Sequence, residues 1–150
     1  MRKDLRRDLF VDLQYSIRKA LSQATGYTVK FMENGMESPL EDMPIMHLVE
    51  EEANYDLIAK LRESVNVRVD YKLEIYARDI MELKRMQGAV TNYILFESIP
   101  YIHVETGEVV GEIIAEPSFM AMEYLREVSR TTEYLRRQFF FNVSVVLHKH

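Results

Sequence analysis

Histidines are the residues of this sequence best suited to acid–base or metal chemistry, and the sequence contains four of them. No HExxH or other metal-ligand spacing links His47, His103, His148 and His150. We interpret them as surface or packing residues, the last two at a chain end of the kind that commonly frays. The sequence also contains no GxSxG, no P-loop and no GxGxxG, which mark hydrolase, nucleotide and dinucleotide sites. We therefore predict no catalytic residue, no metal ligand, no cofactor and no enzymatic activity.

One pattern resembles the residues with which metal-dependent nucleases hold a divalent cation and activate water. Asp70 lies on an expected strand, and Glu82-Leu83-Lys84 supplies an acid-x-lysine triplet. The triplet is expected on a helix, however, where residues two apart do not share a face. Glu82 also stands three residues after Asp79, in the register of a capping box. Capping explains Glu82 better, and we reject the nuclease interpretation.

The sequence contains two clusters of charged residues that the stability of the local secondary structure does not explain. A basic cluster lies at the start of the first expected helix, where cations oppose the helix dipole, and residues 33–63 hold nine acidic residues against two basic ones. The plain interpretation is solvated surface. The alternative is contact between the two clusters of neighbouring subunits, or with another protein. The candidate subunit or partner interface comprises Arg2, Lys3, Arg6, Arg7, Glu50, Glu51, Glu52, Arg136 and Arg137.

The composition is that of an ordinary folded protein: 150 residues, 47% hydrophobic and 29% charged, without repeats or low-complexity tracts. We expect a single domain over residues 1–150. The absence of cysteine rules out disulfides and cysteine zinc sites, and it suits a reducing cytoplasm. No window approaches the roughly 20 apolar residues of a membrane span, so we expect a soluble protein without a membrane partner. The acidic cluster and the net charge of −5 disfavour ordinary binding to duplex DNA.

The spacing of apolar residues predicts the helices and strands that position these residues. Residues 2–24 predict an amphipathic helix that Gly26 ends. Residues 27–31 and 45–49 predict short strands, and residues 33–44 an irregular loop. The clearest signal is residues 65–77, where every odd position is apolar and even positions are polar except Tyr76. This alternation predicts a long strand with one buried face.

The second half of the chain continues the pattern. Asp79 predicts the cap of a helix that runs to about Phe96, and Gly88 inside it suggests close packing. Residues 99–104 and 109–115 predict a hairpin. Residues 118–136 fit helix and strand equally well. The last strand, at residues 139–147, is apolar on both faces and is therefore either central or covered by a partner.

This layout resembles that of the tail-terminator (tail-completion) proteins of long-tailed bacteriophages. A helix opens the chain, the segment Met43-Pro44-Ile45-Met46 enters a strand with an acidic end, and the long alternating strand leads directly into a capped helix. An aromatic-rich strand closes the chain. The resemblance implies an α+β fold: a mixed, mainly antiparallel sheet with an N-terminal helix and a second helix, after the long central strand, packed on one face.

The resemblance also implies a function. Six copies would form a ring on the finished tail tube, stop addition of the major tail tube protein, and present a docking surface to the head connector proteins. DNA would pass through the lumen without sequence-specific binding, and acidic residues there would repel it. The protein would be assembled in the host cytoplasm and located in the tail or neck of the virion. The alternatives are another neck component (a head-completion or connector protein) and a small enzyme or regulatory domain with an unmarked site.

Overall fold

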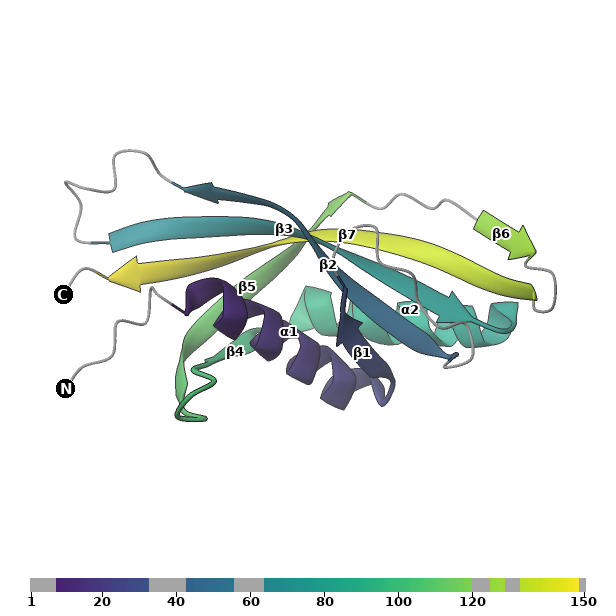
Figure 1. Ribbon diagram of the computed structural model, residues 1–150, viewed down its shortest axis with the longest axis horizontal. Coiled ribbons are helices and arrows are strands. Elements are labelled where there is room, and N and C mark those ends of the chain that lie inside the picture. Colours follow the sequence, from purple (N-terminus) through teal and green to yellow (C-terminus); the bar gives the residue numbers. More distant parts are fainter. Residues whose placement is uncertain (1–7, 33–42, 56–63, 120–124, 129–132, 149–150) are drawn as a thin grey trace.

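A curled sheet with both helices on one face forms the centre of the computed structural model, which describes residues 8–32, 43–55, 64–119, 125–128 and 133–148 (Figure 1). Among the described residues, six of the seven strands lie in the order β1-β2-β3-β7-β5-β4, and the seventh, β6, pairs with β7. Among the strand pairs that the structure describes, β1 and β2 alone pair in parallel; the others are antiparallel. The fold class predicted from the sequence, α+β with a mainly antiparallel sheet, is therefore confirmed. The elements are α1 (Leu9–Thr25), β1 (Thr28–Phe31), β2 (Ile45–Tyr55), β3 (Ser64–Ala77), α2 (Ile80–Phe96), β4 (Ile99–Ile102), β5 (Val109–Phe119), β6 (Leu125–Val128) and β7 (Glu133–His148).

The first helix forms because its apolar residues recur every four positions and meet the sheet as one stripe. Leu13, Ile17 and Leu21 are completely buried. Gly26 ends the helix in the left-handed conformation, at φ 76°, and donates its N–H to the Ser22 carbonyl. The predicted end is thus confirmed, and residues 2–7 of the predicted helix lie outside the described residues.

The central strands β3 and β7 pair over the whole length of β3, from Ser64 opposite His148 to Ala77 opposite Leu135. The odd residues of β3 from Val67 to Ala77 are all buried on the face that carries the helices. The alternation predicted from the sequence is confirmed there. The interpretation of the last strand as central is also confirmed, because β7 lies between β3 and β5.

The second helix begins with the predicted cap. Asp79 accepts a hydrogen bond from the Glu82 N–H at 2.8 Å, and the Glu82 carboxylate accepts one from the Arg78 N–H at 3.2 Å. The close packing expected at Gly88 is wrong, since no atom lies within 4 Å of the place where a Cβ would stand.

The two edge strands β1 and β4 both contact α1, although they lie at opposite ends of the strand order. This requires the sheet to curl around the helix, as Figure 1 shows. The core formed between them combines α1, α2 and the inner face of the sheet. Neither helix of the described chain is long and apolar enough to cross a membrane.

Strand boundaries are where the sequence interpretation needs correction. β2 continues through the acidic residues to Tyr55, with a register shift between Glu50 and Glu52, instead of ending at Val49. β7 begins at Glu133, so it includes Arg136 and Arg137 instead of following them. The ambiguous region contains the end of β5, the short strand β6 and the start of β7; residues 120–124 and 129–132 lie outside the described residues.

Candidate functional site

A buried polar cluster joins α1 to the strand β4 and the residues that follow it. Asp12 is completely buried, and its carboxylate accepts hydrogen bonds from the Tyr101 hydroxyl at 3.1 Å and the Val104 N–H at 3.0 Å. The His103 Nδ1 atom lies 3.0 Å from the same carboxylate. Burial raises the pKa of Tyr101, and the charges of Asp12 and Asp8 and the Asp12 hydrogen bond raise it further. The phenol therefore stays protonated and remains a donor to Asp12.

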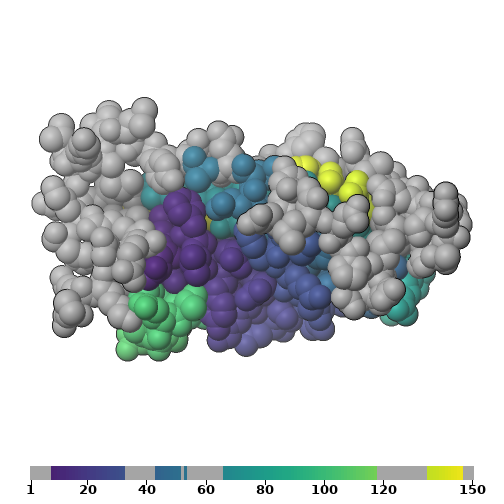
Figure 2. All heavy atoms as spheres, in the orientation of Figure 1, coloured from purple at the N-terminus to yellow at the C-terminus, as the bar shows by residue number. Residues whose placement is uncertain are grey.

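Ser16 extends this cluster by one helical turn. Its hydroxyl accepts a hydrogen bond from the Ile102 N–H at 2.9 Å. Asp12 and Ser16 stand four residues apart on one helix face, about 6 Å along the axis. Ser16 binds the N–H group of Ile102, the last residue of β4, and Asp12 binds that of Val104 in the turn that follows, so the helix supplies acceptors to the end of this edge strand. Figure 2 shows the start of α1 (purple) against the β4–β5 hairpin (green).

A second candidate site is an arm of the sheet, which consists of residues 49–55 of β2, 64–72 of β3 and 140–148 of β7. β1 pairs with β2 only as far as Leu48, and β5 pairs with β7 only as far as Ser144. Within the described residues, the edge of β2 over residues 49–55 and the edge of β7 over residues 145–148 therefore continue without a strand partner, whereas residues 140–144 of β7 pair with β5. In Figure 1 the arm lies at the left, where β3 and β7 run past the start of α1.

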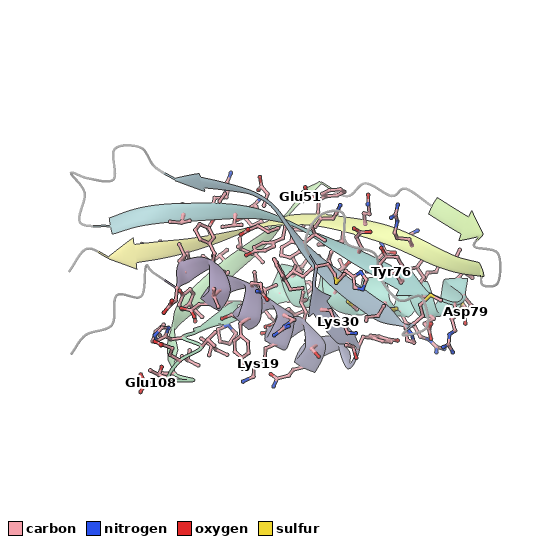
Figure 3. All side chains as sticks on the ribbon, viewed as in Figure 1. Lys19, Lys30, Glu51, Tyr76, Asp79 and Glu108 are labelled. Atoms are coloured by element: carbon pink, nitrogen blue, oxygen red, sulfur yellow. The ribbon has the colours of Figure 1, made fainter. Side chains whose placement is uncertain are left out.

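The outer face of the sheet, opposite the helices, carries an ion network. The Glu74 carboxylate contacts Lys72 at 3.5 Å, Arg136 at 3.3 Å and the Tyr76 hydroxyl at 2.8 Å. Lys72 also contacts Glu51 at 3.3 Å. Figure 3 shows Glu51 at the upper side of the sheet and Lys19 of α1 at the lower side.

No protein-family model matches this chain, and no curated protein does. The residues and their geometry therefore carry the functional argument.

The nine charged residues predicted as an interface are not brought together as one surface by the described part of the chain. Arg2, Lys3, Arg6 and Arg7 lie outside the described residues. Glu50 is exposed on β2 opposite Tyr71, and Glu52 lies opposite Asp70 with its side chain outside what the structure describes.

The other three candidates contact their own chain. Glu51 pairs with Lys72, and Arg136 pairs with Glu74. Arg137 is buried on the helix side of β7, where its guanidinium donates to the Gln87 side chain of α2. These pairs stabilise the sheet and α2. Glu50 is exposed on the sheet face that also carries Tyr71, and partial burial raises its pKa.

The structure also shows where the residues of the rejected nuclease interpretation lie. Asp70 lies on the outer face of β3, whereas Glu82 lies on α2, which packs against the inner face. The two carboxylates are on opposite sides of the sheet. Glu82 is engaged in the cap described above, as the sequence interpretation predicted.

Sequence reasoning missed the Asp12 cluster entirely. Its members are separated by 86 to 92 residues, and no local spacing connects them. Two signals could have suggested it. Asp12 and Ser16 lie beside the apolar stripe of α1, and His103 continues the buried alternation of Ile99 and Tyr101.

Proposed function

We propose that this chain is a structural protein that assembles into a ring, as the tail terminators of long-tailed phages do at the head-proximal end of the tail tube. The observation that carries the proposal is the arm with its two strand edges. The edges differ: one belongs to β2 and the other to β7. Pairing the β2 edge of one copy with the β7 edge of the next is a heterologous contact, and such contacts form a ring when the rotation between copies closes.

Two further observations support this proposal. The helices pack on one face of a mixed sheet in the arrangement that the resemblance implies. Val146, near the end of β7, is 54% exposed on the outer face, and Ile114, opposite its neighbour Ser144, is 59% exposed. An apolar pair beside an open strand edge is a feature that a neighbouring subunit would cover.

In this role the ring stops addition of the major tail tube protein and offers its other side to the head connector proteins. The acidic residues of β2, Glu50 among them, stand at a proposed subunit boundary. Acidic residues that reach the lumen repel DNA and let it pass without sequence-specific binding.

The test is the native mass of the purified chain, followed by electron microscopy with tail tubes. We expect a ring of about six copies, alone or on the ends of tubes. Val146→Lys places a cation at the β7 edge and should reduce ring formation. Leu95→Lys on α2, where the side chain is 55% exposed, is the matched control and should assemble normally. A chain that stays monomeric and never binds tubes refutes the proposal, and binding to connectors but not to tubes indicates another neck component.

A further inference from the structure

The imidazole of His103 is held in one orientation by its contact with Asp12. His103 is 2% exposed, and its Nδ1 atom lies 3.0 Å from Asp12 Oδ2. Asp12 is fixed in turn by the Tyr101 hydroxyl and the Val104 N–H. A carboxylate accepts, so Nδ1 donates in this contact, and in the neutral ring Nε2 presents its lone pair.

That second nitrogen has no hydrogen-bond partner among the described residues, although it is buried. A buried polar atom without a partner costs free energy and calls for an explanation. The nearest charged group is the Glu105 carboxylate, whose Oε2 lies 3.8 Å from Nε2. Either a proton on Nε2 or a metal ion between the two atoms would make this approach favourable.

A third ligand atom completes the arrangement. One carboxylate oxygen each of Asp8 and Glu105 and the His103 nitrogen all lie within 4.8 Å of one another. Ligand atoms about 2.0–2.2 Å from a first-row metal lie about 3–3.5 Å apart, so a modest movement closes the set. The Glu105 side chain is exposed, and Asp8 stands at the start of α1, so the two carboxylates come from separate elements.

We propose that Asp8, His103 and Glu105 form a binding site for one first-row divalent cation, with Zn²⁺ and Mn²⁺ as the fitting ions. One imidazole nitrogen and two carboxylate oxygens suit these ions better than Ca²⁺ or Mg²⁺, which prefer oxygen ligands throughout. Asp12 acts as the outer partner that orients the histidine, an arrangement typical of metal-ligating histidines. The bound ion links the start of α1 to the turn of the β4–β5 hairpin.

The site is independent of ring assembly, so its test does not depend on the proposed function. The test is isothermal titration calorimetry of the full chain, freed of metal by chelator, with ZnCl₂ and with MnCl₂. Because His148 and His150 could bind metal by themselves, every variant is made in a His148→Gln/His150→Gln background. We expect one ion per chain. Co²⁺ should give visible absorption bands that report a nitrogen ligand.

Two substitutions decide the result. Glu105→Gln leaves the buried histidine in place and should weaken binding by about tenfold or more. His103→Gln should abolish the cobalt spectrum. Glu112→Gln, an exposed acid on β5, is the control and should bind like the parent. Absence of binding in the parent, or equal binding by the parent and Glu105→Gln, overturns the proposal.

Discussion

The Ser16 hydroxyl accepts a hydrogen bond from the Ile102 N–H at 2.9 Å and donates one to the carbonyl of the same residue at 3.3 Å. One side chain of α1 therefore serves both backbone groups of a residue on an edge strand. Such groups are the ones that lead to aggregation when they are left unpaired. The helix thus protects β4 by hydrogen bonding as well as by apolar contact.

Ser16→Ala should lower the free energy of unfolding by about 1–2 kcal/mol, because it leaves a part-buried N–H without its acceptor. The Ile102 amide should exchange with deuterium faster, while the Val104 amide, bound to Asp12, should change less. Ser98→Ala, at an exposed position, is the control. Unchanged exchange at Ile102 would contradict the assigned bond.

Asp12→Ala should cost about 3 kcal/mol or more, because Tyr101 and the Val104 N–H lose a buried acceptor at the same time. Asp12→Asn keeps one acceptor oxygen and should cost less. Urea denaturation measures both. Glu116→Ala, exposed on β5, should stay within about 0.5 kcal/mol of the parent. Equal costs for Asp12→Ala and Glu116→Ala would mean that the cluster does not stabilise the fold.

Leu73→Asp should prevent folding, because it buries an unpaired charge at a completely buried position of β3. Asn66→Asp, exposed on the same strand, should be tolerated. Circular dichroism and thermal melts distinguish the two. If both variants melt like the parent, the burial pattern of β3 is wrong.

Lys72 lies on the outer face of β3, but substitutions there should still affect stability because two carboxylates contact its side chain. Its ammonium lies between the carboxylates of Glu51 and Glu74, at 3.3 and 3.5 Å. Lys72→Asp would bring three carboxylates together, and we expect a measurable loss of stability from it. Lys72→Met, which keeps most of the side-chain volume, should cost less than Lys72→Asp in the same melts.

The lowered pKa of His47 predicts that the stability of the fold depends on pH. Burial lowers the pKa of His47; the Glu74 charge opposes this, and the Lys30 charge adds to it. The folded pKa then lies below the unfolded value of about 6.5. The unfolded chain binds the proton more readily, so this contribution is complete above about pH 6.5 and is lost as the pH falls toward the folded pKa.

The measurement is urea denaturation at several pH values below 7, together with NMR titration of the His47 ring. His47→Gln should flatten the decline in stability over this interval. A ring that titrates above 6.5 would contradict the prediction.

Glu50→Lys tests the proposed subunit contact. Among the described acids of the predicted interface, Glu50 is the one whose reversal does not place a cation beside Lys72. We expect the monomer to fold normally, since surface changes usually cost less than about 0.5 kcal/mol. Ring formation or tube capping should weaken, most clearly at low salt, because the Debye length is about 8–10 Å at physiological ionic strength.

The readout is tail length. The parent should give tails of fixed length, and Glu50→Lys should give overlong or unjoined tails. Glu108→Lys on the β4–β5 hairpin is the matched control (Figure 3). Normal capping by Glu50→Lys at every salt concentration would make this acid ordinary solvated surface.

The parts of the fold that the sequence predicts well are those encoded by neighbouring residues. The alternation of β3 and the cap formed by Asp79 and Glu82 depend on spacings of two and three positions, so each can be read locally. The extension of β2 could not be read in this way. Its acidic residues look like a loop, and they form a strand because β3 supplies a partner as far as Val67, opposite Tyr55.

The candidate sites likewise depend on contacts between residues that are far apart in the sequence. Arg137 looks like a surface cation in sequence, and only the pairing of β7 with β3 places it against α2. His103 looks isolated because Asp12 precedes it by 91 residues. Contacts over such separations depend on the whole topology, and no local pattern predicts them.

The hydrogen bonds from α1 to Tyr101, Ile102, His103 and Val104 also constrain the order of events in folding. Each joins residues 86 to 92 positions apart. During translation, α1 leaves the ribosome well before the strand whose backbone it serves, so its buried carboxylate must remain hydrated until β4 has been synthesised. Contacts of this separation slow folding. These hydrogen bonds of α1 can therefore form only after residues 101–104 have been synthesised.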